Sequence, residues 1–137
     1  MIIGEGPGEQ EDTHGVPFIG RSGQLLTKML DYAEINRDKD IFIANTVKCR
    51  PPKNRTPNNS EIDACKPYLI RQIQLIQPKI LLLLGSPSLK TILEEHLPIT
   101  KVRGTWFKTT VNYMTTPLYI MPLFHPSYLL RNASKEI

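Results

Sequence analysis

Four carboxylates stand close together near the start of the chain, beside a run of glycines. They are Glu5, Glu9, Glu11 and Asp12, and residues 1–20 contain no lysine or arginine. Carboxylates at the end of a strand can activate a water molecule or stabilise a cationic transition state. The alternative is an acidic surface turn without a catalytic role. The run at residues 4–8 is neither a dinucleotide fingerprint nor a P-loop, since it lacks the third glycine of the first motif and the Gly-Lys-Ser/Thr of the second.

Three further side chains could bind and act on a planar ligand. Asn45 ends a predicted strand, where its amide could read the edge of a base through a donor and an acceptor together. An Asx-type turn is the alternative for this residue. Phe18 could be a stacking platform for a base or an ordinary core residue. His125 follows another predicted strand and could donate a hydrogen bond to developing negative charge, or have only a structural role.

Basic residues are gathered in two parts of the sequence that contain no acid. One is residues 46–57, and the other lies between Glu95 and Glu136. The chain has 17 basic and 13 acidic residues, which gives a net charge of +4. An acidic cluster beside basic stretches indicates carboxylate chemistry on a polyanionic substrate. The solvated surface of a small basic domain would give the same charge pattern.

The elements that must position these residues alternate between strands and helices. We expect strands at residues 1–4, 41–47, 79–84 and 118–124, with an edge strand at 109–113. Helices are expected around residues 25–33, from residues 58–60 to Pro78, and at 86–96, with an irregular loop at 51–59. Asn58 and Glu61 have the spacing of a capping box. This alternation predicts a single three-layer α/β/α domain over residues 1–137 with a central, mostly parallel sheet. Because ligands bind at the carboxyl ends of such strands, the loops at residues 4–15, 45–55, 85–86 and 125–131 form the expected site.

The composition agrees with an ordinary globular domain. The chain has 137 residues, of which 40% are hydrophobic, and its longest strongly apolar run is residues 80–84. That run is far shorter than the ~20 residues of a membrane span, so neither a membrane segment nor a signal peptide is expected. Two cysteines, Cys49 and Cys65, exclude a disulfide scaffold and favour a cytoplasmic protein. As a pair they are a weak metal signal, with buried thiols as the alternative.

Taken in order, these motifs resemble the family 4 uracil-DNA glycosylases, the iron–sulfur type found in bacteria and archaea. The resemblance is carried by Gly4-Glu5-Gly6-Pro7-Gly8 with Glu11-Asp12, Gly15-Val16-Pro17-Phe18-Ile19-Gly20-Arg21-Ser22-Gly23-Gln24-Leu25-Leu26, Asn45-Thr46-Val47-Lys48-Cys49-Arg50-Pro51-Pro52 with Asn54-Arg55, Cys65-Lys66-Pro67, residues 78–85, and His125-Pro126-Ser127-Tyr128-Leu129-Leu130-Arg131-Asn132. It runs across nearly the whole chain.

The resemblance implies a DNA-repair hydrolase that excises uracil by cleaving the base–sugar bond after flipping the nucleotide out of the stack. It implies that Phe18 stacks on uracil, that Asn45 hydrogen-bonds its polar edge and that Gly6 offers only its backbone. His125 is expected to donate to uracil O2 as the base leaves. Glu5 and Glu11 are the candidate carboxylates beside the cationic sugar, and the water-positioning role stays open between them.

The resemblance also implies contacts with DNA and a metal cluster. The residues expected on the DNA backbone are Lys48, Arg50, Arg55, Ser127 and Arg131. A [4Fe–4S] cluster held by four cysteines is implied, with Cys49 and Cys65 as the third and fourth ligands. The family's first two cysteines precede the Gly4 motif, and a further helix follows the region of residues 132–135, so this chain is expected to lack both.

The sequence leaves three functions open. The first is an active uracil-DNA glycosylase, whose expected partner is uracil-containing DNA. We expect it to be a monomer without an obligate protein partner. The alternative is a truncated, non-catalytic remnant of such an enzyme that at most binds DNA. A generic small α/β nucleotide-binding module is the third.

Overall fold

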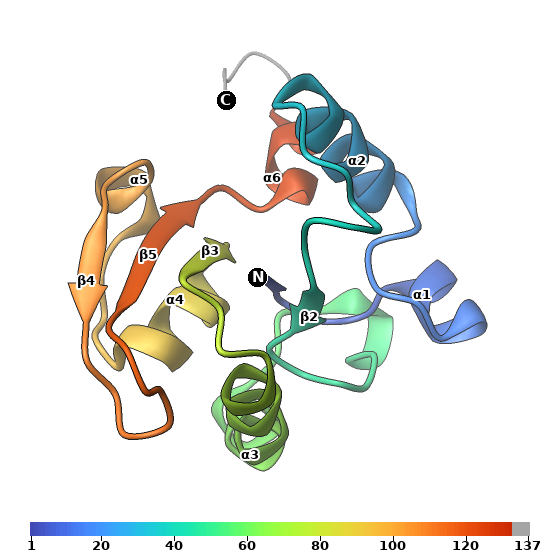
Figure 1. Cartoon of the computed structure of the whole chain (residues 1–137). Coiled ribbons are helices and arrows are strands. Elements are labelled where there is room, and N and C mark those ends of the chain that lie inside the picture. The colour runs from blue at the N-terminus through green and yellow to red at the C-terminus, as the bar shows by residue number, and fades with distance from the viewer. Residues whose placement is uncertain (133–137) are drawn as a thin grey trace.

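A sheet of five strands forms the centre of the computed structural model, which describes residues 1–132 (Figure 1). The strands are β1 (Ile2–Gly4), β2 (Ile43–Asn45), β3 (Ile80–Leu84), β4 (Phe107–Thr109) and β5 (Leu118–Leu123). Their order across the sheet is β2-β1-β3-β5-β4. Every neighbouring pair is parallel except β4 and β5, which are antiparallel. The expected mostly parallel sheet is therefore confirmed.

Helices cover both faces of this sheet and make the expected three layers. The helices α3 (Asn59–Ile76) and α4 (Ser86–Leu93) pack on one face, and α2 (Arg21–Tyr32) packs on the other, in contact with α6 (Pro126–Arg131). Side chains alternate between the faces along each strand. Ile3 therefore lies in the core beneath α3 and α4, and Ile2 lies in the core beneath α2. Among the described residues, no helix has the length and apolar character to cross a membrane.

The predicted long helix is confirmed together with its capping box. The Asn58 side chain accepts a hydrogen bond from Glu61 N at 2.9 Å, and the Glu61 carboxylate accepts one from Asn58 N at 2.9 Å. This exchange satisfies two backbone donors that the first turn leaves unpaired. The helix ends at Ile76, two residues before Pro78. The predicted strand at 41–47 is shorter than expected and covers only Ile43–Asn45.

Several local predictions were wrong. The edge strand expected at residues 109–113 lies at Phe107–Thr109, because the chain turns at Val111, whose carbonyl accepts a hydrogen bond from Met114 N. The regions 4–15 and 125–131, expected as loops, contain the short helices α1 (Glu9–His14) and α6. A 3₁₀ turn, η1 (Pro52–Asn54), and a short helix, α5 (Ile99–Val102), were also missed. The expectation that this chain lacks the family's further helix concerns the region of residues 132–135, which lies beyond the described residues except for Asn132.

Candidate active site

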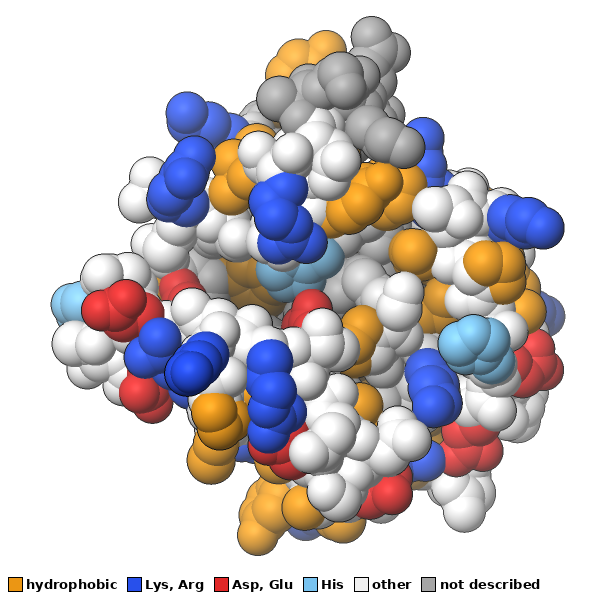
Figure 2. Space-filling view, turned by 180° about the vertical axis from the view of Figure 1, so that it is seen from behind, with side chains coloured by type: hydrophobic (Ala, Val, Ile, Leu, Met, Phe, Trp, Pro, Cys, Tyr) orange, Lys and Arg blue, Asp and Glu red, His pale blue; other side chains and the backbone are white. Residues whose placement is uncertain are grey.

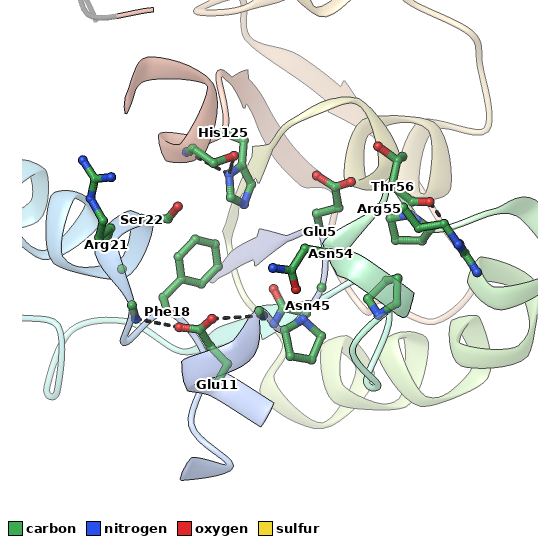
Figure 3. Close-up of a pocket in the computed structure, with 18 of the residues that line it drawn as sticks. Glu5, Glu11, Phe18, Arg21, Ser22, Asn45, Asn54, Arg55, Thr56 and His125 are labelled. Carbon is green, nitrogen blue, oxygen red and sulfur yellow. Dashed lines mark hydrogen bonds between the residues drawn. The ribbon is translucent and has the colours of Figure 1, made fainter. Parts of the chain in front are cut away.

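A cavity of about 360 Å³ opens where β1, β2 and β5 end. Figure 2 shows the corresponding hollow, with histidine and acidic side chains at its floor and lysine and arginine side chains around it. Of the predicted site residues, it is lined by Glu5, Gly6, Glu11, Phe18, Asn45, Arg55, His125, Ser127 and Arg131. Lys48, Arg50, Cys49 and Cys65 are not part of this lining. The strand order thus brings residues that are far apart in the sequence to one site, as Figure 3 shows.

Phe18 places its ring on one wall of the cavity. Only 5% of the residue is exposed, and its ring centroid lies 5.5 Å from that of His125 at an interplanar angle of 30°. Two glycines make this placement possible. A Cβ at Gly4 would lie 2.4 Å from the Phe18 ring, and a Cβ at Gly23 would lie 1.9 Å from the Phe18 backbone. The flat ring can therefore rest directly on the end of β1 and serve as a stacking surface.

Asn45 ends β2 and brings a buried amide to the cavity. The residue is 8% exposed, and among the described residues its Oδ1 has no hydrogen-bond partner. An unpaired buried carbonyl costs about 1–3 kcal/mol, so native structures rarely keep one without a reason. A ligand that offers an N–H to this oxygen would remove the cost. The cavity thus presents a buried amide oxygen that can accept a hydrogen bond.

His125 caps the N-terminus of α6 and faces the Phe18 ring. Its Nδ1 accepts a hydrogen bond from Ser127 N at 3.1 Å and lies 2.7 Å from Ser127 Oγ. Because a backbone N–H can only donate, Nδ1 is an acceptor and the neutral ring carries its proton on Nε2. Burial, together with the positive charge of Arg131, lowers the pKa of His125 to about 4. The imidazole is thus a neutral hydrogen-bond donor at physiological pH.

Glu5 and Glu11 have different surroundings. Burial raises the pKa of Glu5, while a hydrogen bond from Thr56 and the positive charge of Arg131 partly oppose this rise. Figure 3 shows Glu5 and Thr56 side by side at the cavity. This carboxylate lies in a partly desolvated wall, where a charge acts strongly on a bound ligand.

Glu11 binds the backbone instead of facing the cavity freely. Its Oε2 accepts hydrogen bonds from Gly20 N at 2.6 Å and Ile19 N at 3.0 Å, and its Oε1 accepts one from Gly8 N at 3.0 Å. Partial burial raises the pKa of Glu11, but these backbone hydrogen bonds outweigh it and lower the pKa overall. Glu11 therefore fastens α1 to the segment that carries Phe18.

Most of the predicted DNA-binding side chains have partners within the protein. Lys48 Nζ donates to Asn45 O at 2.7 Å and to Gln72. It therefore stabilises the end of β2 and does not line the cavity. Arg55 forms a salt bridge of 2.6 Å with Glu61.

Of the other three side chains, Ser127 and Arg131 line the cavity, and Arg50 does not. Arg50 donates to Asn54, and the Ser127 hydroxyl contacts His125. Arg131 is exposed at the rim. Sequence reasoning missed Arg21, Ser22, Asn54 and Thr56, which also line the cavity.

The two cysteines do not complete a cluster site. Cys49 is exposed, and Cys65 Sγ accepts a hydrogen bond from Lys48 N at 3.4 Å, which places the two cysteine segments next to each other. A [4Fe–4S] cluster needs four protein ligands, and these residues supply two thiolates. In the part of the chain that the structure describes, no three His, Cys, Asp or Glu residues are grouped to hold a metal ion. These residues alone do not fit the implied cluster.

Comparisons with known proteins found a matching family model and several similar proteins. Residues 1–137 match the family model described as the uracil DNA glycosylase superfamily. The type-4 uracil-DNA glycosylase of Thermotoga maritima is 45% identical, and the match covers 100% of this chain and 69% of that protein. The type-4 enzyme of Sulfurisphaera tokodaii is 46% identical, over 96% of this chain and 61% of the relative. A DNA polymerase of Bacillus phage SP01 is 30% identical over 96% of this chain but only 13% of its own length.

Proposed function

Because this chain belongs to the type-4 family of the uracil-DNA glycosylase superfamily, we propose that it excises uracil from DNA by hydrolysing the bond between the base and the sugar. One observation carries this proposal. Among residues 1–132, the buried Oδ1 of Asn45 has no hydrogen-bond partner, and it lies in the same cavity as the Phe18 ring and the neutral His125. This is the combination that a flipped pyrimidine base requires.

Recognition of uracil follows from the chemistry of its edge. Uracil presents an N3–H donor beside the O4 acceptor, so Asn45 Oδ1 can accept from N3 while Nδ2 donates to O4. Cytosine presents an amino group and an unprotonated N3 at these positions, which leaves the same amide mismatched. Buried polar groups left unpaired give strong discrimination. Phe18 stacks on the base, and Gly6 contributes only backbone, since a Cβ there would lie 2.7 Å from Val47.

Bond cleavage places negative charge on the base and positive charge on the sugar. The electron pair of the C1′–N1 bond moves to uracil, and the Nε2–H of His125 donates a hydrogen bond to O2 as charge develops there. The sugar becomes an oxocarbenium ion, which an ionised Glu5 stabilises. Water then adds to C1′ and gives a proton to the Glu5 carboxylate, which releases it to solvent, and the uracil anion takes up one proton from solvent. We assign the water to Glu5 rather than Glu11, because three backbone N–H groups already occupy the Glu11 oxygens.

The proposal is tested with a labelled oligonucleotide that contains one uracil. Incubation followed by alkali should break the strand at uracil and leave matched thymine and cytosine strands intact. Folded protein is verified by a cooperative thermal transition. Failure of a folded sample to break the uracil strand would falsify the proposal.

A DNA-binding protein without excision activity is the second candidate. It is favoured by the cysteine content, because the described residues supply two of the four thiolates of the implied cluster. The chain also spans only 61–69% of the two type-4 relatives described above. Fluorescence anisotropy separates the candidates, since a remnant binds the labelled uracil strand and leaves it intact. The absorbance of an iron–sulfur cluster after reconstitution with iron and sulfide tests whether two cysteines suffice.

A further inference from the structure

We propose that Arg37 is a positioning residue for uracil recognition, and that its guanidinium fixes the backbone of residues 17–20 so that the Phe18 ring faces the flipped base. We call residues 17–20 the Phe18 turn. This inference rests on the proposed function, because it deepens the stacking role of Phe18. No motif in the sequence singles out Arg37, which lies between α2 and β2.

The backbone of Phe18 has a conformation that needs support. Its φ is +53°, in the left-handed region that favours glycine and strains an aromatic residue. The turn also presses against the first part of α2, where only a glycine at position 23 leaves room for the Phe18 carbonyl. Such strain persists only where surrounding contacts hold it. The Phe18 turn must therefore be fixed by neighbouring groups.

Arg37 supplies contacts to the carbonyls of this turn. Its Nη2 donates to Pro17 O at 2.5 Å, and its Nη1 donates to Phe18 O at 2.5 Å. Nη1 also lies 2.9 Å from Thr27 Oγ1 on α2. The planar, forked guanidinium suits two neighbouring acceptors, which a lysine ammonium cannot reproduce. Arg37 therefore holds two successive carbonyls in one orientation.

Glu11 holds the other side of the same turn. Its carboxylate accepts from the N–H groups of Ile19 and Gly20, which directly follow Phe18. A cation thus fixes the carbonyls of the Phe18 turn, and an anion fixes its amides. Arg37 is not among the cavity-lining residues, but its Nη1 donates to the carbonyls of two residues that are, Phe18 and, at 3.4 Å, Gly23. Loss of Arg37 should release the strained turn and move the ring out of its stacking position.

A double-mutant cycle tests this coupling. In protein that retains Phe18, Arg37→Met should lower kcat/KM for a uracil strand about 10- to 100-fold, mainly through KM, as expected for loss of base stacking. In the Phe18→Ala background the same change should have less than a twofold effect. Arg37→Lys should restore little activity, because it lacks the fork. Arg71→Met, on the exposed side of α3, is the matched control and should change nothing. Equal losses in both backgrounds would overturn the proposal.

A second readout does not depend on activity. The chain has four phenylalanines, so protein labelled with 4-fluorophenylalanine gives few ¹⁹F signals, and Phe18→Leu identifies the signal of Phe18. Arg37→Met should shift or split that signal and leave the other three in place. An unchanged Phe18 signal would contradict the inference. This result holds even if the wild-type protein excises no uracil, an outcome that would overturn the proposed function alone.

Thr27→Val covers the case in which Arg37→Met does not fold. It removes the Thr27 hydroxyl that contacts Arg37 and should move the Phe18 signal in the same direction by a smaller amount. An unmoved signal in a folded Thr27→Val protein would then count against the proposal.

Discussion

At the scale of single residues, Asn45 shows a conflict between stability and ligand binding. Its buried Oδ1 has no hydrogen-bond partner among the described residues, which costs free energy, and leucine of similar size would remove that cost. We expect Asn45→Leu to raise the free energy of unfolding by about 1 kcal/mol. The same change should lower kcat/KM on a uracil strand by about 10²- to 10³-fold, because N3–H and O4 would lose their partners. Urea unfolding and single-turnover excision measure the two effects, with the exposed Asn112→Leu as control.

His125 makes stability depend on pH in a defined window. Its pKa is about 4 in the folded protein and about 6.5 when unfolded, so the unfolded chain binds more protons between these values. The contribution is fully present above pH 6.5 and is lost as the pH falls to 4, by up to about 3 kcal/mol. Urea unfolding at pH 7 and pH 4.5 should therefore show a smaller decrease for His125→Gln than for wild type. Equal decreases would contradict the neutral, buried imidazole.

The sequence could identify Phe18, Asn45, His125 and Glu5 as site candidates, because each has side-chain chemistry that suits the reaction and lies in a motif that resembles the family's. It could not separate Glu5 from Glu11, since the difference is a set of backbone hydrogen bonds that form only in the folded chain. For the same reason Lys48 was expected on DNA, whereas its ammonium contacts Asn45 O and Gln72.

At the scale of elements, the parts with strong apolar patterns were predictable, and the short helices α1, α5 and α6 were not. The run Ile80–Leu84 and the capping box of α3 identify β3 and α3 directly. Helix α1 contains no buried residue, so it has no apolar period for sequence reasoning to detect. Its position depends on Glu11 rather than on packing.

Removal of the Glu11 carboxylate should therefore loosen α1 and the Phe18 turn together. We expect Glu11→Ala to lower the free energy of unfolding by about 2 kcal/mol, since hydrogen bonds to charged groups contribute about 1.5–3 kcal/mol. Because the pKa of Glu11 is lowered in the folded state, its stabilisation is present above pH 4.5 and is lost as the pH falls through the lowered value. Glu9→Ala, on the exposed surface of the same helix, is the control. Similar losses in the free energy of unfolding for both variants would show that stability depends only on the helical content of α1.

The loop around η1 controls Glu5 through Thr56. The Thr56 hydrogen bond lowers the pKa of Glu5 against the effect of burial, so Thr56→Val should raise that pKa further. An ionised Glu5 is needed for the proposed reaction. The acid limb of kcat/KM against pH should therefore move to higher pH in Thr56→Val, and Thr56→Ser should restore it. If the profile does not move, the Thr56 hydrogen bond does not set the pKa of Glu5, and the loop around η1 has no such role.

At the scale of the whole molecule, the face that carries the cavity combines a hollow with basic side chains. The net charge of +4 is modest, but basic side chains surround the hollow in Figure 2. One cation of the cavity lining, Arg55, is already paired in a salt bridge with Glu61. Arg131 is exposed on α6, and its charge reaches both Glu5 and His125. Its position thus suits two roles, a contact with a DNA phosphate and an effect on the pKa values of Glu5 and His125.

Arg131→Gln should separate these two roles. If Arg131 neutralises one phosphate, the slope of log K against log salt for a uracil strand should become shallower by about 0.7–0.9. Loss of its positive charge should also raise the pKa of Glu5, so the acid limb of kcat/KM should move to higher pH. Arg71→Gln on α3 removes the same charge from the molecule without touching the cavity. A change in salt slope equal to that of Arg71→Gln would show that only net charge matters, whereas a larger change for Arg131→Gln places the DNA backbone at α6.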